Sequence, residues 1–142
     1  MTLVLDASMV LAWHLKRQNP GESALAQSAL REVASQGAIV PSLCYSEIGN
    51  GLLMSERRQL TDAGQVAAFQ MDLAQLSVSL DSASPNATLS RVLSLSRSWG
   101  LTTYDATYLE LVLRTKWPLA TFDRQLAEAT RKAGARVFGD PA

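Results

Sequence analysis

The sequence has a single histidine, His14, and a single cysteine, Cys44, among its 142 residues. One cysteine cannot form an internal disulfide or a zinc site built from cysteines. Cys44 lies in an apolar stretch, which favours a buried thiol with a packing role. One histidine leaves no pair of imidazoles for acid–base catalysis, and a serine nucleophile would lack its usual base unless His14 lay beside it. We expect His14 on the first helix, away from the acidic residues described below.

The sequence also has no excess of charge, because 13 basic residues balance 13 acidic ones. A neutral chain gives no broad attraction to nucleic acid, so any basic footprint must be local. No apolar run approaches the length of a membrane span, and Asp6 interrupts the first one, which makes it a poor signal peptide. No Walker loop or GxGxxG motif occurs, so a nucleotide cofactor is not expected. These absences predict a cytoplasmic protein without a membrane segment.

Short apolar runs alternate with longer helical patterns along the whole chain. Apolar residues make up 47% of it, as in a folded globular protein. The predicted strands are TLVLD, AIV before Pro41, SVSL, PLAT and ARVF. The predicted helices cover about 8–15, 24 to Gly37, 42–58, 61–75 with a Thr61 cap, 84–100, 104–116 and 124–133. Strands separated by helices predict a parallel sheet covered on both faces. We therefore expect one three-layer α/β/α domain over residues 1–142, with a mainly parallel sheet of five strands.

Four carboxylates carry most of the functional information: Asp6, Glu47, Asp105 and Asp123. Asp6 and Asp123 follow predicted strands, and ligand sites of parallel sheets lie outside the carboxyl ends of the strands. Arg124 is the one cationic residue within two positions of any of the four. If the fold brings the acids together, their repulsion requires divalent cations, and oxygen ligands favour Mg²⁺ or Mn²⁺.

Each acid also has an ordinary structural interpretation. Asp6, Asp105 and Asp123 each stand where a helix begins, and aspartate is a favoured N-cap. None has the Glu or Gln three residues later that completes a capping box. Glu47 alone would be a solvated helix residue. The joint pattern favours a shared site over four separate structural roles.

Three further polar residues lie beside these acids in sequence. Ser8 and Thr121, each two residues from an aspartate, could orient metal ligands, or could serve as turn and cap hydroxyls. Asn50 lies one turn from Glu47 on the same helix face. Gly49 and Gly51 flank Asn50, and each glycine costs a helix roughly 1 kcal/mol relative to alanine. They indicate a close approach by another element, a bend near Glu47, or a tolerated cost.

Two other acid-bearing α/β families fit poorly. The DAS segment at Asp6 resembles the start of a haloacid-dehalogenase phosphatase motif, but Ser8 replaces the second aspartate, which would act as the acid. A response-regulator receiver needs an aspartate after its third strand, which Asp81 imitates, and a lysine after its fifth. No lysine follows ARVF.

Three segments together resemble PIN-domain ribonucleases of the VapC toxin type, found in type II toxin–antitoxin systems. They are LDASMVLAW, VPSLCYSEIGNGLLMSERRQLT and LTTYDATYLELVLRTKWPLATFDRQLAEATRKAGARVF, and their order and spacing cover nearly the whole chain. The resemblance implies a parallel sheet between helices and an acidic pocket that binds Mg²⁺ or Mn²⁺. The residues that match the family's acidic positions are Asp6, Glu47, Asp105 and Asp123. Those that match its accompanying polar positions are Ser8, Asn50 and Thr121.

The resulting functional hypothesis is a metal-dependent endoribonuclease with those four acids as metal-binding and catalytic residues. The resemblance also implies a small antitoxin partner and a homodimer. The alternative is a PIN-like module that binds RNA or protein without cleaving. Basic residues that could hold the RNA backbone are Arg57, Arg58, Arg114, Lys116 and Arg124. Apolar residues that could form a groove for the antitoxin are Leu52, Leu53, Leu60 and Phe69.

Overall fold

Four short strands form one parallel sheet in the computed structural model of the chain, which describes residues 1–141. They are β1 (Leu3–Leu5), β2 (Ala38–Val40), β3 (Val78–Leu80) and β4 (Leu119–Ala120), in the spatial order β3-β2-β1-β4. The central strand β1 consists of three apolar residues that are all buried. A strand between two covered faces needs such a continuous apolar run, and this run ends at Asp6.

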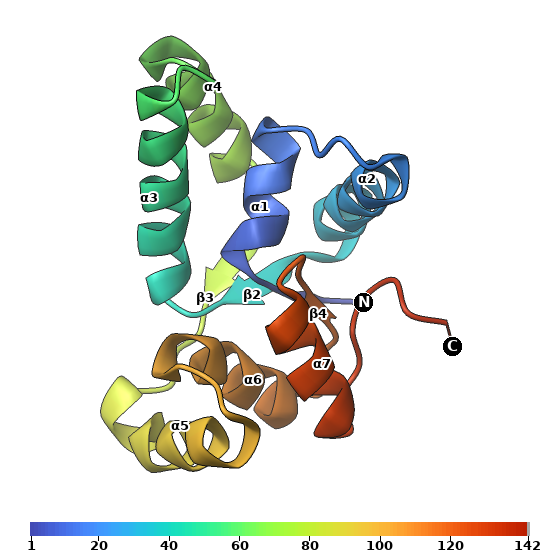
Figure 1. Cartoon of the computed structure of the whole chain (residues 1–142), viewed down its shortest axis with the longest axis vertical. Helices are drawn as coiled ribbons and strands as arrows, with labels where there is room; N and C mark the ends of the chain where they lie inside the picture. Colours follow the sequence, from blue (N-terminus) through green and yellow to red (C-terminus); the bar gives the residue numbers. More distant parts are fainter. Residues whose placement is uncertain (142) are drawn as a thin grey trace.

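Seven helices cover the two faces of this sheet. They are α1 (Ala7–His14), α2 (Pro20–Gln36), α3 (Leu43–Arg57), α4 (Ala63–Ala74), α5 (Pro85–Trp99), α6 (Thr103–Thr115) and α7 (Arg124–Lys132). Figure 1 shows α1 to α4 above the sheet and α5 to α7 below it. Both α2 and α6 pack against β1. The predicted α/β/α layering is therefore confirmed, and none of the helices within residues 1–141 is long and apolar enough to cross a membrane.

The prediction that ARVF forms a fifth strand is wrong. Val137 makes a single parallel bridge to Leu119. Since β4 has only two residues, its free edge offers little length for pairing. The backbone of Gly139 then adopts a φ of 98°, in the region that favours glycine, and the chain turns away. The sheet consequently has four strands.

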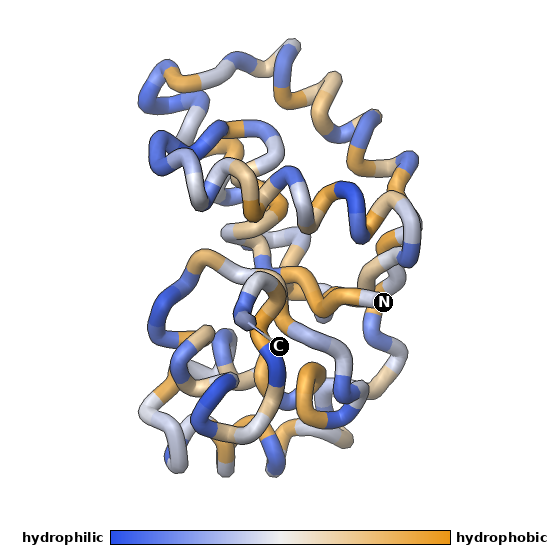
Figure 2. Tube along the Cα trace, turned by 90° about the vertical axis from the view of Figure 1, so that its right-hand side faces the viewer, coloured by the Kyte–Doolittle hydropathy of each residue, from blue (hydrophilic) through white to orange (hydrophobic). Residues whose placement is uncertain are grey.

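The buried side chains form a core that follows the sheet and the inner faces of the helices. Figure 2 shows hydrophobic segments running through the middle of the molecule. The interior includes Tyr108, the largest fully buried side chain in the described part of the chain. By contrast, α4 contributes no buried residue. Its N-terminus is capped by Asp62, which accepts a hydrogen bond from the Gln65 amide, and the prediction that Thr61 caps this helix is wrong.

The paired glycines of α3 have different environments. A Cβ atom on Gly51 would lie 2.5 Å from a methyl group of Leu11, so α1 and α3 approach closely at this point. A Cβ atom on Gly49 would meet nothing within 4 Å. The close-approach interpretation therefore applies to Gly51 and not to Gly49.

Candidate active site

Asp6 leaves the carboxyl end of β1 and is 6% exposed. Its Oδ2 atom accepts hydrogen bonds from Ser8 Oγ at 2.6 Å and from Thr121 Oγ1 at 2.6 Å. Although Asp6 occupies the N-cap position of α1, its side chain makes no capping hydrogen bond. The capping interpretation is therefore wrong for Asp6, whose carboxylate is held by two hydroxyls from opposite ends of the chain.

The same two hydroxyls connect the start of α1 with the loop between β4 and α7. The Phe122 amide donates to Ser8 Oγ at 2.9 Å, and the Asp123 amide donates to Thr121 Oγ1 at 2.9 Å. Each hydroxyl thus accepts from the loop while it donates to Asp6. This network fixes the position of the loop that carries Asp123 relative to Asp6.

Of the other two aspartates, one caps a helix and one does not. Asp123 is an N-cap, since its Oδ1 accepts a hydrogen bond from the Leu126 amide at 3.0 Å. Asp105 is not, because Thr102 caps α6 and accepts from the Asp105 amide at 3.1 Å. The Asp105 carboxylate lies in the first turn of α6, where the helix dipole favours a negative charge.

Glu47 projects from α3 and is half-buried. Its Oε1 accepts a hydrogen bond of 2.6 Å from the hydroxyl of Tyr108. Tyr108 lies three residues after Asp105 on α6, a spacing that places two side chains on one helix face. Sequence reasoning missed Tyr108, although its spacing from Asp105 was a usable signal.

The charges of the four acids influence one another. The pKa of Asp105 rises to about 6 because the side chain is desolvated by burial and repelled by Asp123, Asp6 and Glu47. Burial also raises the pKa of Glu47; the Tyr108 hydroxyl opposes this change, and the charges of Asp6 and Asp123 add to it. Such repulsion arises when neighbouring carboxylates lack a compensating cation.

The donor chemistry of the site suits a hard cation. Burial raises the pKa of the Cys44 thiol to about 12, so Cys44 does not supply a thiolate. His14 is bound to Thr61 Oγ1 at 2.8 Å and lies against the Phe69 ring. The remaining donors are carboxylate and hydroxyl oxygens, which fit Mg²⁺ or Mn²⁺ rather than zinc. Within residues 1–141, no three acidic, histidine or cysteine side chains stand together as a formed metal site.

Two of the other polar residues singled out from the sequence do not join the site. Asn50 is exposed, and within residues 1–141 it makes no side-chain hydrogen bond to the acids. The Arg114 guanidinium is engaged by Asp81 and Glu110, and it is therefore not free to hold RNA. Arg124, beside Asp123, is exposed.

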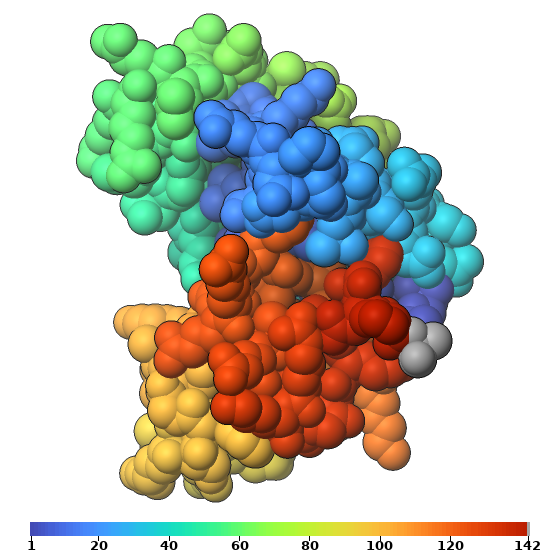
Figure 3. Space-filling model, turned by 45° about the vertical axis from the view of Figure 1, so that its right-hand side comes forward, coloured from blue at the N-terminus to red at the C-terminus, as the bar shows by residue number. Residues whose placement is uncertain are grey.

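The surface around the acids is open. Figure 3 shows a notch at the left of the view, between the N-terminal helices and the orange and red C-terminal part. Beside Asp123 lies a cavity of about 380 Å³ whose lining includes Phe122, Arg124 and Arg131. This cavity leaves room for a ligand next to Asp123.

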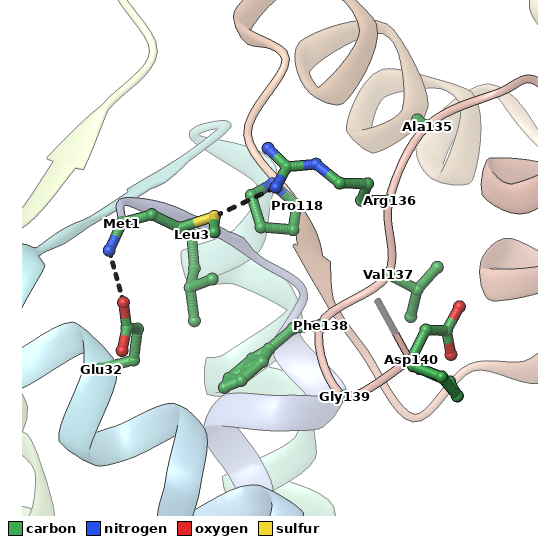
Figure 4. Close-up of a pocket in the computed structure, with 11 residues that line it drawn as sticks. Met1, Leu3, Glu32, Pro118, Ala135, Arg136, Val137, Phe138, Gly139 and Asp140 are labelled. Carbon is green, nitrogen blue, oxygen red and sulfur yellow. Dashed lines mark hydrogen bonds and ion pairs between the residues drawn. The ribbon is translucent and has the colours of Figure 1, made fainter.

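A larger cavity, of about 490 Å³, lies elsewhere (Figure 4). Leu3, Pro118 and Phe138 contribute to its apolar wall, and the Met1 amino group pairs with Glu32 at its rim. It opens at the start of β1, at the opposite end of the strand from Asp6. The cavity in Figure 4 is therefore not part of the acidic site.

The raised pKa of Asp105 predicts a specific pH dependence of stability in metal-free buffer. Its ordinary value is 3.8, so between pH 3.8 and about 6 the folded state binds more protons at this group than the unfolded state does. The contribution of Asp105 to the free energy of unfolding is therefore fully present below pH 3.8 and is lost as the pH rises to about 6. The difference in unfolding free energy, wild type minus Asp105→Asn, should become smaller or more negative between pH 4 and pH 7. Urea titrations in buffer with a chelator measure it. A constant difference would contradict the prediction.

The fold and the site define a class: an α/β protein with a carboxylate centre at the carboxyl ends of its parallel strands. The model of the PIN domain family matches residues 3–132, and the chain belongs to that family. A curated relative, Ribonuclease VapC3 of Pyrobaculum aerophilum, is 29% identical over 128 residues, which is 90% of this chain and 94% of the relative.

Two solved structures share the fold. The crystal structure of PAE2754 from Pyrobaculum aerophilum has a TM-score of 0.64 at 21% identity, covering 91% of this chain and 84% of that one. A toxin–antitoxin complex from Klebsiella pneumoniae has a TM-score of 0.58 at 16% identity, covering 85% of each chain. At these identities the likeness concerns the fold.

Proposed function

We propose that this protein is a metal-dependent endoribonuclease and the toxin of a toxin–antitoxin pair, formed by a single PIN domain. The observation that carries the proposal is how four carboxylates are linked: Ser8 and Thr121 bind Asp6 and hold the loop that carries Asp123, and Tyr108, one turn after Asp105 on α6, binds Glu47. Burial, together with the charges of Asp123, Asp6 and Glu47, raises the pKa of Asp105. Membership of the PIN family and the similarity to Ribonuclease VapC3 support ribonuclease activity.

In the proposed mechanism, Asp6 and Asp105 would be the principal residues to hold the cation, and Asp123 would hold it directly or through water. When bound, Mg²⁺ or Mn²⁺ supplies positive charge to the phosphate and acidity to the attacking water. Ser8 and Thr121 orient the Asp6 carboxylate through their hydrogen bonds to Oδ2.

The fourth acid, Glu47, and the basic residue Arg124 would act on the water and on the RNA. Glu47 would bind the metal through water or help to align the attacking water by accepting a hydrogen bond from it. Arg124 contacts a phosphate of the RNA next to Asp123, as its exposure allows.

Removing divalent metal should stop cleavage. Purified protein with a labelled RNA pool should lose activity in EDTA and regain it with added Mg²⁺ or Mn²⁺. Because water is the proposed nucleophile, the products should carry 5′-phosphate and 3′-hydroxyl ends. Undiminished cleavage in chelator, or 2′,3′-cyclic phosphate as the first product, would show that the mechanism is wrong. RNA binding without cleavage at any metal concentration would favour the non-cleaving alternative.

We also propose an antitoxin partner and a homodimer. The groove predicted from sequence is corrected by the structure. Leu52 is buried and Phe69 packs on His14, so of the four predicted residues only Leu53 and Leu60 are exposed for a partner.

The acidic site is a suitable receptor for an arginine of the partner, since guanidinium pairs bidentately with carboxylates. Co-expression with the product of the adjacent reading frame should yield a stable complex with suppressed cleavage. Expression alone without growth inhibition, together with no binding by the adjacent product, would remove the toxin assignment and leave the nuclease assignment intact.

A further inference from the structure

Tyr108 has a fully buried side chain whose hydroxyl reaches the acidic site. Its ring is 0% exposed in the core beneath α6, and its Oη donates to Glu47 Oε1 at 2.6 Å. The bond joins two residues 61 positions apart, on α6 and α3. One turn earlier on α6 lies Asp105, so the bond also fixes Glu47 relative to a second acid.

The hydroxyl is not needed to fill the core. A phenylalanine ring would occupy the same space, whereas a buried hydroxyl is costly unless a hydrogen bond satisfies it. Glu47 is a long side chain with several rotatable bonds, and in the described part of the chain its carboxylate has no other hydrogen bond. The Tyr108 hydroxyl is therefore the contact that restricts the orientation of this carboxylate.

We propose that Tyr108 is a positioning residue, which anchors Glu47 through Oε1 and leaves Oε2 available for the metal and its water. The proposal rests on the proposed function of the site and adds to it a residue from the core. Partners that orient the ligands of a metal typically change metal affinity or activity by about 10- to 100-fold when they are removed.

Tyr108→Phe removes one oxygen atom and keeps the ring. We expect the Mg²⁺ concentration for half-maximal cleavage to rise, or kcat to fall, by at least about tenfold, with KM for RNA little changed. The Mg²⁺-induced rise in melting temperature should shrink in parallel. Tyr45→Phe is the matched control: Tyr45 is exposed on α3, two residues from Glu47, a spacing that places the side chains on different faces.

A double-mutant cycle separates positioning from simple packing. If Tyr108 acts through Glu47, Tyr108→Phe should change metal affinity and kcat by less than about twofold in a Glu47→Ala background, which leaves the Tyr108 hydroxyl no acceptor at position 47. An equal loss in both backgrounds, or wild-type values for Tyr108→Phe alone, would overturn the proposal.

A third measurement does not depend on the Phe variant folding. With 3-fluorotyrosine in place of tyrosine, the ¹⁹F resonance of Tyr108 can be assigned by removing Tyr45 and Tyr104. It should shift during a Mg²⁺ titration, and this shift should be lost in Glu47→Gln. A resonance unaffected by saturating Mg²⁺ would contradict the proposal. Failure of the wild type to bind metal or cleave RNA would instead contradict the proposed function.

Discussion

Replacing Asp6 with asparagine should lower RNA cleavage by on the order of a hundredfold or more, because it removes charge from the position where a cation must stabilise the reacting phosphate. The amide oxygen of the asparagine can still accept one of the hydrogen bonds from Ser8 and Thr121, so the loop between β4 and α7 should keep its place. The expected loss is therefore chemical and not structural. Cleavage of a labelled RNA at saturating Mg²⁺ measures it.

The same substitution should leave the protein as stable as the wild type, or more stable, in metal-free buffer. Asp6 raises the pKa of both Asp105 and Glu47 by repulsion, and neutralising it relieves that repulsion. Thermal unfolding with EDTA tests this, with Asp72→Asn as the control, since Asp72 is an exposed acid on α4. A stable Asp6→Asn protein with more than a tenth of wild-type activity would contradict the assignment of Asp6.

The position of a strand end was readable from local sequence, and this explains why the neighbourhood of Asp6 was predictable. An apolar run of three residues that stops at an acid indicates both a buried strand and its carboxyl end. A related rule located Asp123, which follows the apolar run of β4 after Thr121 and Phe122. The sequence also singled out the hydroxyls of Ser8 and Thr121, but it did not predict that both donate to the same oxygen of Asp6.

Contacts between distant elements could not be read in this way. The bond from Tyr108 to Glu47 depends on how α6 packs against α3, which no local pattern specifies. The fifth strand failed for a related reason, because the length of β4 decides whether ARVF can pair. The exposure of Asn50 likewise depends on what covers that face of α3.

Arg114 is another residue whose role depends on distant partners. The sequence placed it among the basic residues that could hold the RNA backbone. In the structure its guanidinium donates to both oxygens of Asp81, at 3.1 and 2.6 Å, and to Glu110 at 2.9 Å. Burial by itself would raise the pKa of Asp81, but the bonds from Arg114 and the Ala83 amide lower it below its usual range. Arg114 therefore ties the end of β3 to α6.

Arg114→Met should destabilise the fold by about 3 kcal/mol, the lower end of the range for breaking a buried ion pair. The Glu110 side chain is only 5% exposed, and after the substitution Arg91, at 3.5 Å, is its remaining cationic partner within residues 1–141. A largely buried carboxylate that loses its bidentate partner keeps its desolvation penalty without the compensating bonds. Urea unfolding at pH 7 measures the change, and Arg97→Met, at an exposed position of α5, provides the control.

Arg114→Lys should cause an intermediate loss of stability, because an ammonium group cannot pair with two carboxylates in the same planar geometry. At a temperature where Arg114→Met is folded, its RNA cleavage should stay within about twofold of the wild type, since the guanidinium is occupied by Asp81 and Glu110. Unchanged stability together with weakened RNA binding would contradict this assignment and would show that Arg114 contacts the RNA.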